Sequence, residues 1–233
     1  MKNLIDVRSL GLAAVVLFLP AFARATHWQS TDQWATYSIN GYTVRQDAWG
    51  SGRGPQTIWV DSGTGWWNWG CWSQQPNTGG VKTYPHAAKA VNKSVSSIGS
   101  CTSSWSFTVQ NSGAFNASYD IWASGSTYEI MIWVYKTGAV GPIGTLQGSV
   151  SISGATWNVY KGSNGSNQVF SFVRTSNTTS VSNLNIKSFL TNITGRGWMP
   201  TSAVVGEVQA GFEITSSPAG QNFQTTSYSL TAN

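Results

Sequence analysis

Charge is scarce in this sequence. Asp, Glu, Lys and Arg make up 9% of its 233 residues, against about 25% in an average soluble domain. The net charge of +5 is too small and too scattered to indicate binding to nucleic acid or to an anionic membrane. Ser, Thr, Gly, Asn and aromatic residues are abundant instead. This composition disfavours charge-covered helices, favours strands joined by polar turns, and predicts an all-β domain.

Long apolar runs are also missing. The longest covers residues 10–22, which is shorter than the roughly 20 residues that a membrane-spanning helix needs. Lys2 and Arg8 precede this run and the small-x-small pattern Ala-Arg-Ala follows it, as in a signal peptide with its cleavage site. We therefore expect residues 1–25 to be a signal peptide and residues 26–233 to be one catalytic or binding domain, exported to the extracellular space or the periplasm.

Cysteine and histidine are nearly absent. Only Cys71, Cys101, His27 and His86 occur, which is too few to assemble a metal site or a Ser-His-Asp set convincingly. We expect neither a metal nor an organic cofactor. In an exported chain, two cysteines more often form a disulfide than a catalytic site. The sequence therefore predicts a Cys71–Cys101 disulfide.

Alternating apolar and polar residues predict several strands. They cover residues 114–122, 128–135, 149–152, 155–160, 169–173 and 204–214, with a tight turn at Ser153-Gly154. One segment, residues 184–193, has a helical period, with Ser182 as the expected N-cap and Gly195 as the expected stop. The expected architecture is a jelly-roll β-sandwich of two antiparallel sheets with one short α-helix.

Glutamate is the rarest charged residue, with three copies, and one of them lies in an apolar strand. Strand alternation places Glu129 with Met131, Trp133 and Tyr135 on one face, and the branched apolar residues between them on the other. Glu129 therefore need not be buried in a core. It is expected on the second face of the sheet, beside a thioether and two aromatic rings.

Two further strands carry carboxylates in the same way. Asp120 shares a face with Asn116, and Glu213 shares a face with Glu207 and Gln209. A strand carboxylate is ordinarily a solvent-facing residue, and Glu207, at an expected strand start, keeps that interpretation. Glu129 and Glu213 lie in the most apolar strands, where a solubilising role is least needed. Paired carboxylates on one concave face are what glycosidic bond cleavage requires.

Tryptophan is frequent, with 13 copies. Four of them cluster in the segment DSGTGWWNWGCW: Trp66, Trp67, Trp69 and Trp72. This segment is too dense in Trp for all of them to fill a core, and flat aromatic rings bind the apolar faces of sugar rings by stacking. We expect Trp105, Trp157 and Trp34 in the core, and Trp66 and Trp67 in a carbohydrate-binding cleft.

Seven motifs, in order along nearly all of residues 26–233, resemble those of glycoside hydrolase family 12. They are DQWAT at 32–36, GYTV at 41–44 with Trp49-Gly50, VKTY at 81–84, SYD at 118–120, YEIMIW at 128–133, GPIG at 141–144 and GFE at 211–213. The resemblance implies a retaining endo-β-1,4-glucanase whose concave sheet forms an open cleft for a β-1,4-glucan polysaccharide. Some members of the family act on xyloglucan.

The resemblance also implies roles for the matched residues. Glu129 is similar to the nucleophile, Glu213 to the general acid/base, and Asp120 to the acid that hydrogen-bonds to the nucleophile and helps set its protonation. The expected substrate-binding set consists of residues similar to cleft residues of the family or grouped with them: Asp47, Trp49, Trp66, Trp67, Met131, Trp133 and Gln209.

This sequence departs from the family at three places. Ile214-Thr215 follows the expected acid/base where the family often has Pro-Phe, and Asp47-Ala48 precedes the cleft tryptophan where the family commonly has Asn-Leu. Trp67 stands where many relatives have His. These departures leave the preference among glucans open.

Other classes of protein share some of these features. They are a xyloglucan-specific endoglucanase of the same family, a jelly-roll xylanase, a carbohydrate-binding module without activity, and a structural or host-recognised surface protein. The last two explain the tryptophans but not three carboxylates on polar or aromatic strand faces. We expect a monomer that binds polysaccharide, and neither nucleic acid nor a membrane.

Overall fold

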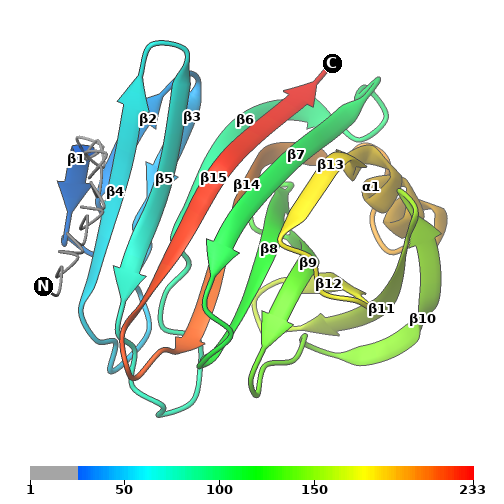
Figure 1. The fold of residues 1–233 in the computed structure, drawn as a ribbon. Coiled ribbons are helices and arrows are strands. Elements are labelled where there is room, and N and C mark those ends of the chain that lie inside the picture. The colour runs from blue at the N-terminus through cyan, green and yellow to red at the C-terminus, as the bar shows by residue number, and fades with distance from the viewer. Residues whose placement is uncertain (1–25) are drawn as a thin grey trace, which may run out of the picture.

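Strands run through nearly all of residues 26–233, the part of the chain that the computed structural model describes. The predicted signal peptide, residues 1–25, lies outside these described residues. Two sheets pack face to face, as the sequence predicts (Figure 1). No helix within residues 26–233 is long and apolar enough to cross a bilayer.

One sheet has six strands in the order β1-β4-β5-β15-β7-β13. Its strands are β1 (Thr26–Ser30), β4 (Gln56–Gly63), β5 (Trp66–Ser73), β15 (Gln221–Ala232), β7 (Cys101–Val109) and β13 (Ser180–Asn185). All its pairs are antiparallel.

The other sheet has nine strands in the order β10-β11-β12-β9-β8-β14-β6-β3-β2. Its strands are β10 (Thr145–Ile152), β11 (Ala155–Ser163), β12 (Gln168–Arg174), β9 (Tyr128–Thr137), β8 (Ala114–Ala123), β14 (Val204–Ser216), β6 (His86–Ser94), β3 (Tyr42–Arg45) and β2 (Thr36–Ile39). One pair, β12 with β9, is parallel. After β9 the chain crosses to the outer edge at β10 and returns by two antiparallel pairings, which gives β12 the direction of β9.

The predicted hairpin between β10 and β11 is present. Ile152 pairs with Ala155, and both residues of the intervening turn have positive φ, 51° at Ser153 and 72° at Gly154. Positive φ at both central positions is the mark of a type I′ turn, whose twist matches that of the strands.

The single helix of the described residues, α1 (Ile186–Gly195), begins later than predicted. Ser182 and Leu184 belong to β13, because Leu184 pairs with Ser103 on β7. The N-cap is Asn185, whose side chain accepts a hydrogen bond from the backbone N–H of Ser188 at 3.1 Å. The apolar face of the helix is buried as its period indicates: Ile186, Phe189, Leu190 and Ile193.

The core lies between the sheets and is rich in aromatic rings. Trp105 and Trp157 are fully buried, as predicted, and the Trp105 ring lies 5.4 Å from Tyr119 and 5.7 Å from Phe212. Trp34 is not a core residue, since it is 57% exposed. It lies in the turn between β1 and β2, where its backbone N–H donates to the side chain of Asp32 at 2.8 Å.

The predicted Cys71–Cys101 disulfide is wrong, because both thiols are free and buried. Strand β15 lies between the strands that carry the two cysteines. Cys71 pairs with Phe223 and Cys101 with Ala232, nine residues further along β15. At a rise of about 3.3 Å per residue, this offset is about 30 Å, whereas a disulfide needs its Cα atoms about 4.4–6.8 Å apart.

Candidate active site

Three carboxylates stand on adjacent strands in the middle of the nine-stranded sheet. Glu129 lies on β9, Asp120 on β8 and Glu213 on β14, and β8 is the strand between the other two. Trp122 pairs with Glu129, and Gln209 pairs with Asp120. The register therefore brings the three side chains together on one face.

The opposite face of the same strands belongs to the core. The residue next in sequence to each carboxylate is fully buried: Ile130 beside Glu129, Ile121 beside Asp120 and Phe212 beside Glu213. This agrees with the alternation read from the sequence. The alternation fails at Tyr135, because the pairing of β8 with β9 shifts between Ala117 and Ser118. This irregularity turns Tyr135 toward the core, where its ring stacks on Phe115 at 5.8 Å.

The three carboxylates line a cleft of about 450 Å³. Four members of the expected binding set line it with them: Asp47, Trp49, Met131 and Gln209. Trp49 is 46% exposed, so its ring is accessible to a ligand. Tyr84, Trp122 and Asn164 also line the cleft, although the sequence did not single them out as binding residues.

Three other members of the expected set do not line this cleft. Trp133 is buried beside Met131, whose sulfur accepts a hydrogen bond from the indole N–H at 3.5 Å. Trp66 and Trp67 lie on β5, which belongs to the six-stranded sheet. Trp67 points inward, with its ring 5.1 Å from that of Tyr42, whereas Trp66 is 40% exposed. The density of tryptophan in this segment does not mark the cleft.

Asparagine amides donate hydrogen bonds to both glutamates. Asn167 Nδ2 donates to Glu129 Oε2 at 2.8 Å, and Asn164 Nδ2 lies 3.5 Å from the same oxygen. Asn116 Nδ2 donates to Glu213 Oε2. Alternation had placed Asn116 on the carboxylate face. Asn164 and Asn167 lie in the loop between β11 and β12, where no strand period could have placed them.

Burial raises the pKa of all three carboxyls. It raises the pKa of Glu129 to about 7, aided by the charge of Glu213 and opposed by the hydrogen bond from Asn167. The pKa of Glu213 is also raised by burial, against the hydrogen bond from Asn116. Asp120, between them, has a pKa well above its ordinary value because of burial and then the charges of Glu129 and Glu213. Burial and the repulsion between like charges therefore favour the protonated forms of these carboxyls.

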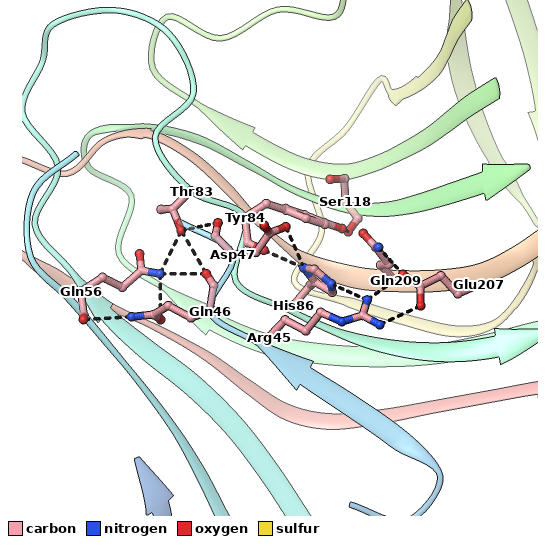
Figure 2. A network of polar contacts seen from close by, with 10 residues as sticks. All are labelled: Arg45, Gln46, Asp47, Gln56, Thr83, Tyr84, His86, Ser118, Glu207 and Gln209. Atoms are coloured by element: carbon pink, nitrogen blue, oxygen red, sulfur yellow. Dashed lines mark hydrogen bonds and ion pairs between the residues drawn. The ribbon is translucent and has the colours of Figure 1, made fainter. Parts of the chain in front are cut away.

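A polar network extends from the cleft toward β3 (Figure 2). Arg45 binds Glu207 in a bidentate pair, with N–O distances of 2.6 and 3.0 Å. Glu207 also accepts a hydrogen bond at 2.6 Å from the side-chain amide of Gln209. Glu207 is therefore neither free nor simply solvent-facing, because it fixes the amide nitrogen of a cleft residue. The pKa of Glu207 is lowered overall. Burial alone would raise it, but the hydrogen bonds from Arg45 and Gln209 outweigh burial.

His86 is buried in the same network and is neutral. Its Nδ1 lies 2.7 Å from the carbonyl oxygen of Tyr84, so Nδ1 carries the hydrogen, and Nε2 accepts from Arg45 at 3.3 Å. Burial lowers the pKa of His86 to about 4. Asp47, 3.7 Å from Nδ1, has a pKa raised to about 6 by burial, against the charge of Arg45. Within the described residues, no three His, Cys, Asp or Glu side chains are grouped to hold a metal ion.

The sequence matches "Glycosyl hydrolase family 12" over residues 40–233. It is 34% identical over 200 residues to the probable xyloglucan-specific endo-beta-1,4-glucanase A of Aspergillus terreus, an alignment that covers 78% of this chain and 79% of that protein. It is 34% identical over 198 residues to the xyloglucan-specific endo-beta-1,4-glucanase A of Emericella nidulans, covering 78% of this chain and 82% of that protein.

Solved structures share the fold. The xyloglucanase domain of NopAA, a type three effector from Sinorhizobium fredii solved in complex with cellobiose, has a TM-score of 0.83 and 39% identity. The match covers 89% of this chain and 100% of that one. Endoglucanase cel12A from Rhodothermus marinus has a TM-score of 0.80 and 25% identity, covering 88% of this chain and 99% of that one.

Proposed function

Since the chain belongs to glycosyl hydrolase family 12 and is an endo-β-1,4-glucanase, we propose that it cleaves its substrate by double displacement with Glu129 as nucleophile and Glu213 as acid/base. The observation that supports these roles is the set of three carboxyls on adjacent strands, with amide donors on Glu129 and Glu213. Double displacement needs two such carboxyls about 5–5.5 Å apart, one ionised and one protonated.

In the first step, an oxygen of the Glu129 carboxylate forms a bond to the anomeric carbon as the glycosidic C–O bond breaks. Glu213 gives its proton to the departing sugar oxygen. In the second step, ionised Glu213 takes a proton from water, whose oxygen attacks the anomeric carbon and releases Glu129. Two inversions at one carbon retain the configuration.

The charges required at the start of this cycle agree with the electrostatics of the cleft. Burial raises the pKa of Glu129 most, and the negative charge of Glu213 raises it further, so a proton on Glu213 removes the second contribution and favours ionisation of Glu129. Asn167, with Asn164 more distant, then stabilises the Glu129 anion. The raised pKa of Asp120, caused by burial and by the charges of Glu129 and Glu213, favours its protonated form and so keeps a third charge out of the site.

The roles can be tested by exchanging the two glutamates separately. Glu129→Gln should abolish turnover of every substrate, because no covalent intermediate forms without the carboxylate. Glu213→Ala should be nearly inactive on a glucan, but on an aryl cellobioside, whose phenol leaves without protonation, the first step should survive. Added azide should then release a β-azide product of retained configuration. Asp32→Asn, which replaces an exposed acid outside the cleft, should keep full activity.

Azide rescue with retained configuration in Glu129→Ala, or an α-azide from the Glu213 variant, would show that the two roles are reversed.

Internal bonds of a β-1,4-glucan are the proposed site of cleavage, because the cleft is open and carries an exposed tryptophan. The viscosity of a soluble glucan should fall before many reducing ends appear. A xyloglucan preference is the second candidate, favoured by relatives named for xyloglucan. Parallel assays on carboxymethylcellulose, mixed-linkage β-glucan, xyloglucan and xylan decide between them, and activity on xylan alone would contradict both.

Secretion as a monomer is also proposed. The basic and apolar pattern of residues 1–25, which ends in Ala-Arg-Ala, supports removal of a signal peptide. The protein recovered from the medium or periplasm should begin at Thr26 and elute as a monomer in gel filtration. Its partner is the glucan itself, with neither nucleic acid nor membrane involved. An N-terminus at Met1 in the cell pellet would contradict secretion.

A further inference from the structure

The outer face of the six-stranded sheet carries almost no charge. Among Asp, Glu, Lys and Arg, its six strands contain only Asp61, which is 6% exposed. The three cleft carboxylates and the Arg45–Glu207 pair all belong to the nine-stranded sheet. A surface without charge cannot attract nucleic acid or an anionic lipid, but it suits a neutral polymer.

Three tryptophans lie on this uncharged face, along the paired strands β4 and β5. Alternation on β5 turns Trp69 and Cys71 into the core, which places Trp66 and Trp72 on the outer side. On β4, Ile58 and Val60 are buried, which places Trp59 on the outer side too. Trp59 pairs with Gly70, which lies between Trp66 and Trp72 on the same face. Figure 1 shows β4 and β5 side by side, next to β15.

Glycines allow these rings to lie along the sheet. A methyl group at Gly70 would come within 2.7 Å of Cζ2 of the Trp59 ring. One at Gly220 would come within 2.6 Å of Cζ2 of Trp72, and one at Gly63 would also collide with the ring of Trp66. Each indole therefore covers a position without a side chain. The result is a row of flattened rings, with Trp59 and Trp72 half-buried and Trp66 more exposed.

Neutral hydrogen-bonding groups border this row. Gln224 pairs with Gly70, and Asn222 with Trp72, on the neighbouring strand β15. Asn222 is exposed and Gln224 half-buried. Aromatic rings that stack on the apolar faces of sugars, beside amides that meet hydroxyl groups, are the chemistry of a polysaccharide site.

We propose that the outer face of the six-stranded sheet binds a β-1,4-glucan chain on Trp59, Trp66 and Trp72, as a second site separate from the cleft. The two sites lie on different sheets, with the core between them. The proposal rests on the proposed function, because the polymer is the substrate of the cleft. A polymer held on the outer face raises the local concentration of substrate without touching the reacting bond.

Binding is measured by the retardation of the protein in native gels that contain xyloglucan or hydroxyethylcellulose. Glu129→Gln is used as the background so that the polymer is not cut. Adding Trp49→Ala weakens binding in the cleft, which Trp49 lines, and the outer site should still retard the protein on the polymer. Adding Trp59→Ala and Trp72→Ala should weaken this residual retardation about ten-fold or more, since these changes remove two of the rings on which sugars would stack. Trp59→Phe with Trp72→Phe, which keeps flat rings, should restore most of it.

Two further measurements separate the outcomes. Without the Glu129 change, Trp59→Ala with Trp72→Ala should hydrolyse a soluble aryl cellotrioside at the parent rate, because this substrate needs only the cleft. Calorimetry of Glu129→Gln alone, with cellotetraose as the ligand, should find more than one molecule bound per protein. This result does not depend on whether the tryptophan variants fold. Unchanged retardation in folded alanine variants, or binding of one chain only, overturns the second site. Absence of all glucan hydrolysis by the parent would instead overturn the proposed function.

Discussion

Replacing one amide beside each glutamate should separate their roles through the pH profile. Burial raises the pKa of Glu129 to about 7, and the 2.8 Å hydrogen bond from Asn167 opposes this rise. Asn167→Ala removes the donor, so the pKa of Glu129 rises further. In the proposed mechanism Glu129 must be ionised to attack, so the acid limb of kcat/KM should move to higher pH.

The size of the shift follows from the hydrogen bond that is lost. A hydrogen bond to a charged group contributes about 1.5–3 kcal/mol, and one pKa unit corresponds to about 1.4 kcal/mol. Glu129 is partly open to the cleft, where water replaces some of the lost stabilisation, so the low end applies. We expect a shift of about one pKa unit. On the acid side, kcat/KM should then fall about ten-fold, with little change on the plateau.

Asn116→Ala is the matched variant on the other glutamate. Its amide opposes the rise that burial produces in the pKa of Glu213. In the proposed mechanism Glu213 must hold a proton to act, so loss of this amide should extend the alkaline limb to higher pH and leave the acid limb in place. Asn177→Ala is the control, since its amide bonds to the carbonyl of Lys136 at 2.8 Å, and Asn177 does not line the cleft. It should move neither limb.

The assay is the initial rate on a soluble aryl cellotrioside across the pH range, with a melting curve for each variant at each end of the range. A shift of the alkaline limb in Asn167→Ala, together with a shift of the acid limb in Asn116→Ala, would reverse the assigned roles. If neither limb moves in two folded variants, these amides do not set the protonation of the site.

Three other predictions concern stability. Because Cys71 and Cys101 are free, the denatured, unreduced protein should titrate two thiols, and a reductant should not change its melting temperature; titration of none would restore the disulfide. Arg45→Met should reduce the free energy of unfolding at neutral pH by about 1 kcal/mol. This difference should disappear as acid protonates Glu207, because the pKa of Glu207 is lowered in the fold. A difference that stays constant with pH would contradict this prediction. Burial lowers the pKa of His86 from 6.5 to about 4 in the fold. As the pH falls between these values, the unfolded protein binds a proton before the folded protein does, so the free energy of unfolding should fall by about 3 kcal/mol. Denaturant unfolding of His86→Gln should lack this fall, and an equal pH dependence in both proteins would refute the prediction.

Strand faces were predictable from the sequence, because the period of two is a property of the backbone itself. Glu129, Asp120 and Glu213 were each placed on the polar or aromatic face of their own strand, without knowledge of sheet order. The period fails at Tyr135, where the pairing of β8 with β9 is irregular. The face of each residue within a regular strand can therefore be predicted from the local sequence, but an irregularity in the pairing of two strands cannot.

Sheet order was not predictable in the same way. The disulfide between Cys71 and Cys101 was inferred from compartment and count, but β15, which comes from the end of the chain, separates their strands. Trp66 was assigned to a cleft because tryptophan was dense, yet β5 joined the sheet that does not carry the carboxylates. Asn167 reaches Glu129 from a loop, whose path depends on the strands that it joins. The errors at the disulfide and at Trp66 concern which strands become neighbours, and that is decided by contacts far apart in the sequence.

The carboxylates are held by strands from the interior of the sheet, and this position links stability to chemistry. Strands β9, β8 and β14 are each paired on both sides, so ladder hydrogen bonds on two edges fix the backbone under each carboxylate. Beneath them, Tyr119, Ile130 and Phe212 are fully buried, and their packing offsets the cost of keeping three acids in a shared, partly dry cleft. A site whose pKa values depend on burial needs this rigid support, because a looser sheet would admit water and return the carboxyls to their ordinary pKa values. Strand alternation thus places every second residue in the core, and this packing maintains the burial that raises the pKa values of the carboxyls between them.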